Sequence, residues 1–177
     1  MKTLQTKRLE LGAFLQSDLE TLREMAGHRK IYETTIAIPH PYTLEHAQAW
    51  IDGQYVDTKT HIFAMRLKEN GKLMGCIDSR FNEVNSSACL GYWVGLPYWG
   101  QGFCTEAARA VIRFSFEELK ANRVWANYLS TNLASSRVME KCNMKFEGTL
   151  RQSLQRGNAF FDMSYRAVLR EEWLKSS

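Results

Sequence analysis

The sequence lacks the features that mark several specialised classes of protein. Its 177 residues include four cysteines, none of them in a Cys-x-x-Cys pair, so neither a zinc knuckle nor a redox dithiol is indicated. No apolar run approaches the ~20 residues that a membrane-spanning helix needs. No run of basic residues is interleaved with aromatic ones. We therefore expect no metal, no membrane association and no direct nucleic-acid binding.

The N-terminus also lacks the apolar stretch and the small-residue cleavage site of a secretory signal, so we expect a cytoplasmic protein with reduced cysteines. Neither a linker nor a repeat interrupts the chain, and its length fits one domain over residues 1–177. The net charge of +4 supports only a mild preference for anionic ligands. We expect a monomer or a homodimer.

Hydrophobic periodicity predicts the order of the secondary-structure elements. Asn70-Gly71 is a strong hairpin signal between two strands in the middle of the chain. Pro39 and Pro41 predict an ordered loop over residues 29–42. The predicted strands are 8–15, 61–68, 72–81, 88–96, 123–132, 144–153 and 159–169, and the predicted helices are 17–28, 44–56, 105–120 and 134–143. This order describes one mixed sheet with helices on its faces, an α+β or three-layer α/β fold.

Capping signals mark the ends of these helices. Ser17 and Thr43 are suited to cap the two helices that follow them, and Asn143 is suited to the left-handed position that ends the last helix. The apolar positions of the second helix recur at helical spacing at Ala47, Trp50, Ile51 and Tyr55.

Residues 98–107, YWGQGFCTEA, place two glycines in a turn that feeds directly into a helix. The dinucleotide fingerprint would need a glycine where Thr105 stands, and no lysine follows for a P-loop. A simpler anion site is still open, because the free N–H groups at a helix N-terminus suit a pyrophosphate. A tight strand-to-helix connection that uses glycine only for its backbone freedom explains the same stretch equally well.

The surrounding motifs favour the anion site. They resemble the GNAT N-acetyltransferases, and within them the RimJ/RimL-like branch of ribosomal-protein N-terminal acetyltransferases. The resemblance runs from about residue 7 to residue 173, and its motifs are specific when taken together and in order. They are Gly91-Tyr92-Trp93, residues 98–107, Asn132-Leu-Ala-Ser135, Glu140-Lys141-Cys142-Asn143, Asp162-Met-Ser-Tyr165, IPHPYT at 38–43 and AWI at 49–51.

The resemblance implies a mixed, mostly antiparallel sheet in which the strands at 88–96 and 123–132 splay apart. It implies that acetyl-CoA is the cosubstrate, with its pyrophosphate on the turn and its pantetheine arm between those strands, the first of which carries a bulge. Diverging strands leave N–H and C=O groups free to bond such an arm. The implied cofactor-binding residues are Trp93, Val94, Leu96, Trp99, Gly100, Gln101, Gly102, Phe103, Cys104, Thr105, Asn132 and Ser135.

The resemblance also implies that Ser135 donates a proton to the departing thiolate. The alternative is that Asn132 and Ser135 only cap the 134–143 helix, and both can be true. Residue 89 often carries a glutamate base in this branch, and here it is Cys89. Cys104 stands where the branch has glycine or alanine, and burial rather than reactivity is the expected fate of such a cysteine.

The missing glutamate leaves the general base open. Asp78 is a catalytic candidate, because a partly buried carboxylate beside the cleft would have a raised pKa. The alternative, which we favour at this stage, is an ion pair between Asp78 and Arg80 on a solvated face. The other carboxylates near the expected cleft are Glu33, Glu83 and Asp162.

The leading hypothesis is acetyl transfer from acetyl-CoA to a primary amine, with a protein N-terminus as one acceptor. A small-molecule amine (a polyamine, an antibiotic or an amino acid) is the alternative acceptor. A non-catalytic CoA-binding module is the alternative function, because the usual base is absent. Residues 29–42 and the 152–160 loop are expected to shape the acceptor site.

Overall fold

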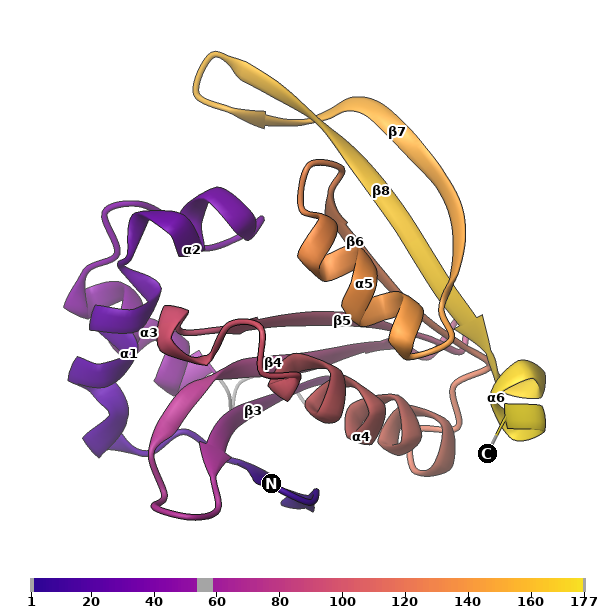
Figure 1. Cartoon of the computed structure of the whole chain (residues 1–177), viewed down its shortest axis with the longest axis horizontal. Helices are drawn as coiled ribbons and strands as arrows, with labels where there is room; N and C mark the ends of the chain where they lie inside the picture. The colour runs from indigo at the N-terminus through magenta and orange to yellow at the C-terminus, as the bar shows by residue number, and fades with distance from the viewer. Residues whose placement is uncertain (1, 54–58, 177) are drawn as a thin grey trace.

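The structure is a computed structural model that describes residues 2–53 and 59–176. Its centre is an eight-stranded sheet in the order β1-β2-β3-β4-β5-β6-β8-β7 (Figure 1). The strands are β1 (Leu4–Gln5), β2 (Leu9–Gly12), β3 (Thr60–Leu67), β4 (Leu73–Asn82), β5 (Ser87–Val94), β6 (Arg123–Leu129), β7 (Lys145–Arg156) and β8 (Ala159–Leu169). The helices are η1 (Gln16–Asp18), α1 (Leu19–Ala26), α2 (Arg29–Thr34), α3 (Leu44–Gly53), η2 (Leu96–Tyr98), α4 (Phe103–Glu117), α5 (Leu133–Lys141) and α6 (Arg170–Ser176).

All strand pairs are antiparallel except β5 with β6, so the predicted mixed, mostly antiparallel sheet is confirmed. The β5–β6 pairing runs from Ser87↔Arg123 to Leu90↔Ala126 and stops there. Beyond that point the two strands diverge, as Figure 1 shows, and this is the expected splay. The bulge expected in β5 is not seen against β4, because their register is unbroken from Asn82↔Ser87 to Gly75↔Val94.

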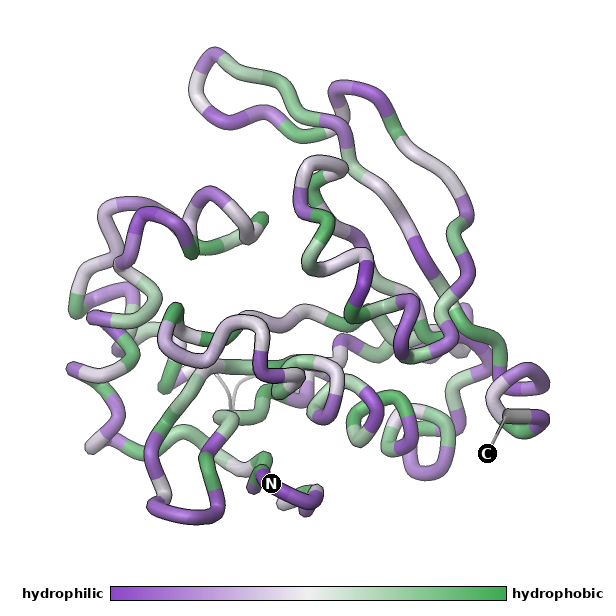
Figure 2. The backbone as a smooth tube through the Cα atoms, in the orientation of Figure 1, coloured by the Kyte–Doolittle hydropathy of each residue, from purple (hydrophilic) through white to green (hydrophobic). Residues whose placement is uncertain are grey.

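The sheet buries a hydrophobic layer on each face. Alternate residues of β3 point to opposite faces, as strand geometry requires: Phe63 and Met65 belong to one core cluster, and Ile62 and Ala64 to the other. The first cluster lies under α4, whose inward stripe is buried, while the second lies under α1 and α3. Figure 2 shows the matching alternation of hydrophobic and hydrophilic residues along α4. Of the predicted inward stripe, Ala108, Val111, Ile112 and Ser115 are buried in α4. The predicted 105–120 helix ends earlier, at Glu117, so Leu119 of that stripe and Lys120 of the predicted outward stripe (Glu106, Arg109, Arg113, Glu117 and Lys120) lie beyond it.

The loop predicted over residues 29–42 begins later than expected. Residues 29–34 form α2, and His28 caps it by accepting a hydrogen bond from the Lys30 N–H at Nδ1 (3.2 Å). The two prolines follow the helix and therefore do not oppose it, so the loop proper covers residues 35–43. This difference places a helix beside the site described below.

The capping predictions have mixed outcomes. Thr43 Oγ1 accepts from the His46 N–H (3.4 Å), and Asn143 has a φ of +60°, as predicted. The Ser17 prediction is wrong, because Asp18 accepts the Leu15 N–H at that turn (2.7 Å). The predicted 44–56 helix is described to Gly53, and Tyr55 lies outside the described residues.

Several boundaries also differ. The strand predicted at 88–96 ends at Val94, and Leu96 belongs to the short helix η2. β1 and α6 carry no clear sequence signal; α6 is placed by Trp173, whose ring stacks on Phe116 with centroids 5.2 Å apart. In the part of the chain that the structure describes, no helix is long and apolar enough to cross a membrane.

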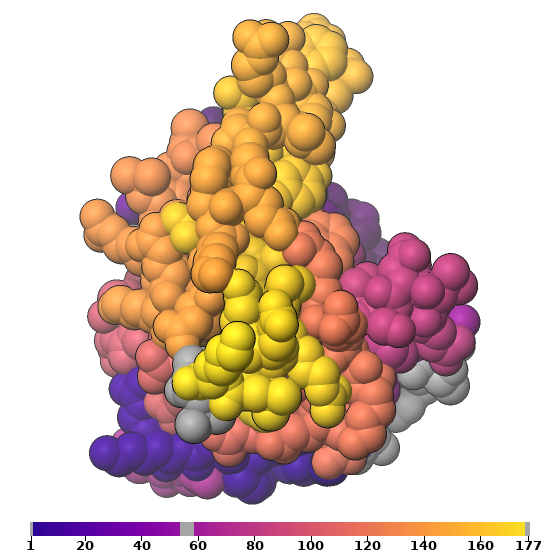
Figure 3. Space-filling view, turned by 90° about the vertical axis from the view of Figure 1, so that its right-hand side faces the viewer, coloured from indigo at the N-terminus to yellow at the C-terminus, as the bar shows by residue number. Residues whose placement is uncertain are grey.

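The β7–β8 hairpin extends well beyond the body of the molecule (Figures 1 and 3). Its turn at Gly157 lies within the predicted 152–160 loop, which is shorter than expected because β7 continues to Arg156. Near the tip, Arg156 reaches back to α2. Arg156 Nη1 donates to the Tyr32 carbonyl (2.8 Å), and the guanidinium lies 4.7 Å from the centroid of the Tyr32 ring. Through Arg156, the hairpin and α2 therefore contact each other across the diverging ends of β5 and β6.

Candidate active site

The glycine turn leaves a row of backbone N–H groups free. Gly100 and Gly102 have φ values of +74° and +80°, a conformation that glycine adopts without strain. Gly102 is the N-cap of the 15-residue helix α4. In the described part of the chain, no acceptor bonds the N–H groups of residues 100–105. Free N–H groups at the positive end of a long helix form a site for an anion such as a pyrophosphate.

Arg8 holds this turn in place, a role that the sequence did not predict. Its Nε lies 2.7 Å from Glu106 Oε2, and its Nη1 donates to the Gln101 carbonyl (3.1 Å). Burial alone would raise the pKa of Glu106, but hydrogen bonds from Thr6 and Arg8 outweigh it and lower that pKa. The guanidinium also lies 4.2 Å from the centroid of the Phe103 ring. Arg8, paired with Glu106, therefore holds the turn against the first turn of α4.

A cavity of about 400 Å³ opens beside this turn, and we call it the turn pocket. The predicted cofactor residues on its wall are Trp93, Val94, Trp99, Gly100, Gly102, Phe103, Cys104, Thr105, Asn132 and Ser135. Leu96 and Gln101 are not among its described lining residues. The Gln101 side chain instead donates to the Pro97 carbonyl (2.7 Å) and braces the turn from outside. Arg137 and Lys141 add positive charge to the wall.

Residues 93–96, at the end of β5, offer few free backbone groups to a pantetheine arm. The Gly95 N–H donates to the Met74 carbonyl (2.8 Å), and the Val94 carbonyl accepts from Trp99 Nε1 (2.8 Å). The Leu96 carbonyl accepts from the Trp99 N–H (3.1 Å). The Val94 N–H is thus the free group of this segment, because the alternation of the β4–β5 ladder turns it away from β4, whereas Trp93 pairs with Cys76.

Asn132, rather than Ser135, caps α5. Asn132 Oδ1 accepts from the Ser135 N–H (3.1 Å), and Asn132 Nδ2 donates to the Thr34 carbonyl (2.9 Å), which ties α5 to α2. The Ser135 carbonyl accepts from the Tyr92 hydroxyl (3.2 Å). The Ser135 hydroxyl makes no hydrogen bond within the described residues. It is therefore held by its helix and free to act on a ligand.

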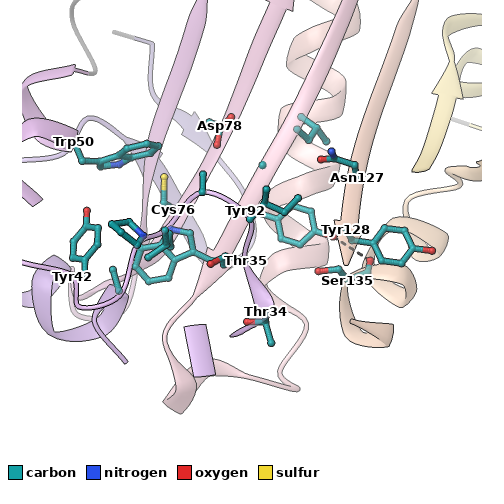
Figure 4. A pocket seen from close by; sticks show the side chains of 18 of the residues that line it. Thr34, Thr35, Tyr42, Trp50, Cys76, Asp78, Tyr92, Asn127, Tyr128 and Ser135 are labelled. Carbon is teal, nitrogen blue, oxygen red and sulfur yellow. Dashed lines mark hydrogen bonds between the residues drawn. The ribbon is translucent and has the colours of Figure 1, made fainter. Parts of the chain in front are cut away.

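A second cavity of about 350 Å³ lies between β4, the splay and the loop after α2, and we call it the strand pocket. Figure 4 shows Asp78 pointing into it between Trp50 and Asn127. Asp78 is only 9% exposed, and burial raises the pKa of its carboxyl to about 6 although the Arg80 guanidinium lowers it. The expected solvated ion pair is therefore corrected: the pair exists, but the carboxylate is buried in a cavity.

The Asp78 carboxylate is held by its ion pair with Arg80. Arg80 Nε lies 2.9 Å from Asp78 Oδ1, although that contact is not aligned for a hydrogen bond. Asp78 faces Gly91 across the β4–β5 pair, and a Cβ at residue 91 would lie 2.6 Å from Asp78 Oδ2. The glycine of the Gly91-Tyr92-Trp93 motif is thus the residue that makes room for this carboxylate.

The two pockets meet. They share a wall made of residues from α2 and its loop, the end of β5 and the start of α5. The shared residues are Thr34, Thr35, Tyr92, Trp93 and Ser135.

The other candidate carboxylates lie outside both pockets, and the two candidate cysteines are not reactive. Glu33 pairs with Arg29 on α2, Glu83 pairs with Lys59, and Asp162 accepts the Gln152 N–H, all outside both pockets. Burial raises the pKa of the Cys104 thiol to about 12 and that of the Cys89 thiol to about 11. Neither thiol is a ready nucleophile, because the thiolate is the reactive form.

The splayed mixed sheet and the glycine turn at the start of α4 match the arrangement that the sequence resemblance implies for an acetyl-CoA-dependent transferase. The comparisons name the family: the acetyltransferase (GNAT) domain model matches residues 8–145, so the chain belongs to this family. The predicted family and its acetyl-CoA-dependent N-acetyltransferase activity are confirmed.

Individual relatives agree in sequence and fold. "Uncharacterized N-acetyltransferase YnaD" of Bacillus subtilis (strain 168) is 28% identical over 171 residues, which cover 96% of this chain and 98% of the relative. A GNAT-family acetyltransferase structure from Bacillus anthracis has a TM-score of 0.88 and 26% identity, with 97% and 100% of the two chains covered. RimL, an α-N-acetyltransferase of a ribosomal protein solved with coenzyme A, shares the fold at 18% identity and a TM-score of 0.84, with 95% and 98% covered.

Proposed function

We propose that this protein transfers the acetyl group of acetyl-CoA directly to a primary amine, with the turn pocket holding acetyl-CoA and the strand pocket holding the amine. The observation that supports this most strongly is the shared wall at Thr35, Trp93 and Ser135. A thioester in one pocket and an amine in the other would come into contact there. Holding two reactants in contact supplies much of the rate of such a reaction.

Asp78 is the proposed general base. An amine entering the strand pocket arrives protonated and must lose a proton before it attacks. The Asp78 carboxylate accepts that proton, and its pKa of about 6 leaves it ionised at neutral pH and still basic enough to take part. Asp78 takes the place that a glutamate at residue 89 would have had.

Ser135 is the proposed general acid. As the C–N bond forms and the C–S bond breaks, the Ser135 hydroxyl gives its proton to the leaving sulfur, which departs as a neutral thiol. The Val94 N–H, which neither the turn nor β4 engages, is the proposed donor to the charge that develops on the thioester oxygen. The Ser135 alkoxide regains a proton from solvent or from the new amide nitrogen.

The acceptor has two candidate classes. RimL is an enzyme for a ribosomal-protein N-terminus, so a protein N-terminus is one candidate. A small amine is the other, and the strand pocket of about 350 Å³ is large enough to hold one. A non-catalytic CoA-binding module would bind acetyl-CoA and release no thiol with any amine.

A thiol-release assay with acetyl-CoA tests this proposal. Because Asn132 is the cap, Ser135→Ala should keep its stability and its acetyl-CoA dissociation constant while kcat falls by about 10²–10⁴-fold. Ser136→Ala is the matched control: it removes a hydroxyl from the same helical turn, outside both pockets. An unchanged kcat in Ser135→Ala would refute the general-acid role, and no thiol release with any amine would refute the transferase.

A further inference from the structure

One row of residues crosses the sheet at the point where β5 and β6 begin to diverge. Asp78 on β4 pairs with Gly91 on β5. The β5–β6 pairing ends one residue earlier, and the residue of β6 that comes next to Gly91 is Asn127. Residues that lie side by side in neighbouring strands point to the same face of the sheet. Asp78, Gly91 and Asn127 therefore share one face, and all three line the strand pocket.

The middle of this row has no side chain of its own. A Cβ at residue 91 would lie 2.6 Å from Asp78 Oδ2 and 3.1 Å from Arg80 Nη2, so the ion pair leans over the glycine toward β6. Paired strands lie about 4.8 Å apart, so little more than one strand spacing separates this oxygen from β6. Figure 4 shows the Asn127 side chain pointing into the pocket from the other side of this gap. A ligand atom in the gap would contact both side chains.

The Asn127 amide is available to a ligand. Four hydroxyl groups of the same wall are engaged by neighbouring helices: those of Thr34 and Thr35 donate to carbonyls of α2 (2.8 Å each), and those of Tyr92 and Tyr128 donate to α5. The side chain of Asn127 makes no hydrogen bond within the described residues, and the residue is half-buried. A half-buried amide normally finds a partner, so its free oxygen on a cavity wall indicates a ligand contact.

We infer that Asn127 orients the attacking amine, with its Oδ1 accepting the N–H that remains in the product amide. The inference rests on the proposed function and adds a second substrate contact to it. A primary ammonium group has three N–H bonds. One proton passes to Asp78, a second is lost as the C–N bond forms, and the third stays on nitrogen. If Asn127 holds the third, the nitrogen lone pair is free to face the thioester at the shared wall.

A neutral amide suits this position better than a second carboxylate. The Arg80 guanidinium beside residue 91 disfavours a bound cation, so the amine stays neutral once Asp78 has taken its proton. A carboxylate at residue 127 would compete with Asp78 for that proton, because like charges at close range raise one of the two pKa values. The oxygen of an amide accepts an N–H without removing its proton. Asp78 is then the one base of the row, and Asn127 fixes the direction of attack.

Two coenzyme A amides test this contact without knowledge of the acceptor. Both carry an acetamide group on the coenzyme A sulfur, one as its N-methyl amide and the other as its N,N-dimethyl amide. The amide nitrogen of each occupies the place of the attacking amine, but only the N-methyl amide has an N–H. In calorimetry the wild type should bind the N-methyl amide about fivefold more tightly, the effect of one hydrogen bond.

Asn127→Leu keeps the size of the side chain and removes its acceptor oxygen, so it should bind the two amides equally. A preference caused by crowding of the second methyl group would survive in this variant. Asn122→Leu is the matched control, because Asn122 precedes β6 and lies outside both pockets, and it should keep the wild-type preference. With any amine that supports thiol release, Asn127→Leu should lower kcat/KM about fivefold and leave the dissociation constant of acetyl-CoA unchanged.

Equal binding of the two amides by the wild type, or a preference that survives in Asn127→Leu, would overturn the inference. No binding of either amide would overturn the proposed coenzyme A site and the inference with it. Thiol release from acetyl-CoA with a panel of primary amines tests the transferase function separately, so the two failures are distinguishable.

Discussion

Asp78→Asn should make the protein more stable while it removes activity. The carboxyl has a pKa of about 6 in the folded protein against a usual value of 3.8, because burial penalises its charged form. The folded state therefore binds the proton more tightly than the unfolded state, and stability falls as the pH rises from 3.8 through 6 and then levels off. A shift of about 2 pKa units corresponds to about 3 kcal/mol of lost stability above pH 7.

Asparagine keeps the shape of the side chain and removes the charge. Its amide must also be buried, so we expect a net gain of about 1–3 kcal/mol at pH 8, which raises Tm by roughly 2–10 °C. At pH 5 only about half of the ionisation cost is present, so the gain should be about half as large. Arg80 is 55% exposed, so water can solvate its guanidinium when its partner is lost.

Thermal unfolding of wild type and Asp78→Asn at pH 5 and pH 8 measures both quantities. Asp52→Asn is the control, because Asp52 is exposed on α3 and should change stability by no more than about 0.5 kcal/mol at either pH. A variant that is less stable than wild type at pH 8, or a gain that does not grow with pH, would refute the reasoning.

Two further predictions concern the turn and the base. Gly102→Asp places a negative charge and a side chain at a φ of +80° beside the free N–H groups, so acetyl-CoA affinity measured by calorimetry should fall at least tenfold. Gly71→Asp, at a φ of +70° in a distant hairpin, should leave that affinity unchanged. If Asp78 is the base, its protonation should lower kcat/KM for the amine by a further tenfold for each pH unit below about pH 6. The pH profile of Asp78→Asn should not show this additional decrease.

The sequence predicted the elements that depend on local signals. The turn and helix at residues 98–107, the Asn70-Gly71 hairpin and the left-handed Asn143 all rest on backbone preferences that a few residues determine. The short helix α2 was not predicted, because its six residues are too few to show a clear hydrophobic period and the prolines that follow it favour a loop.

The parts of the site that depend on distant contacts could not be predicted. Arg8 reaches Glu106, 98 residues away, and nothing near either residue signals the pair. The burial of Asp78 depends on the β4–β5 register, which sets it opposite a glycine. A one-residue change of register would turn the same carboxylate to the other face of the sheet.

The register also explains how the site can work without a glutamate at residue 89. Cys89 and Gly91 are two residues apart on β5 and face the same side of the sheet, and Asp78 fills the space beside Gly91. In the proposed mechanism the base therefore lies on the neighbouring strand β4, opposite residue 91 rather than at residue 89, and on the same face of the sheet.

Asp78→Asn should lower kcat by about 10²–10⁴-fold, and adding Cys89→Glu should restore part of it with a new pH dependence. Cys89→Ser in the same background is the control for loss of the thiol. If Cys89→Glu restores nothing in a folded double variant, residue 89 does not face the reacting amine, and the relocation of the base is wrong.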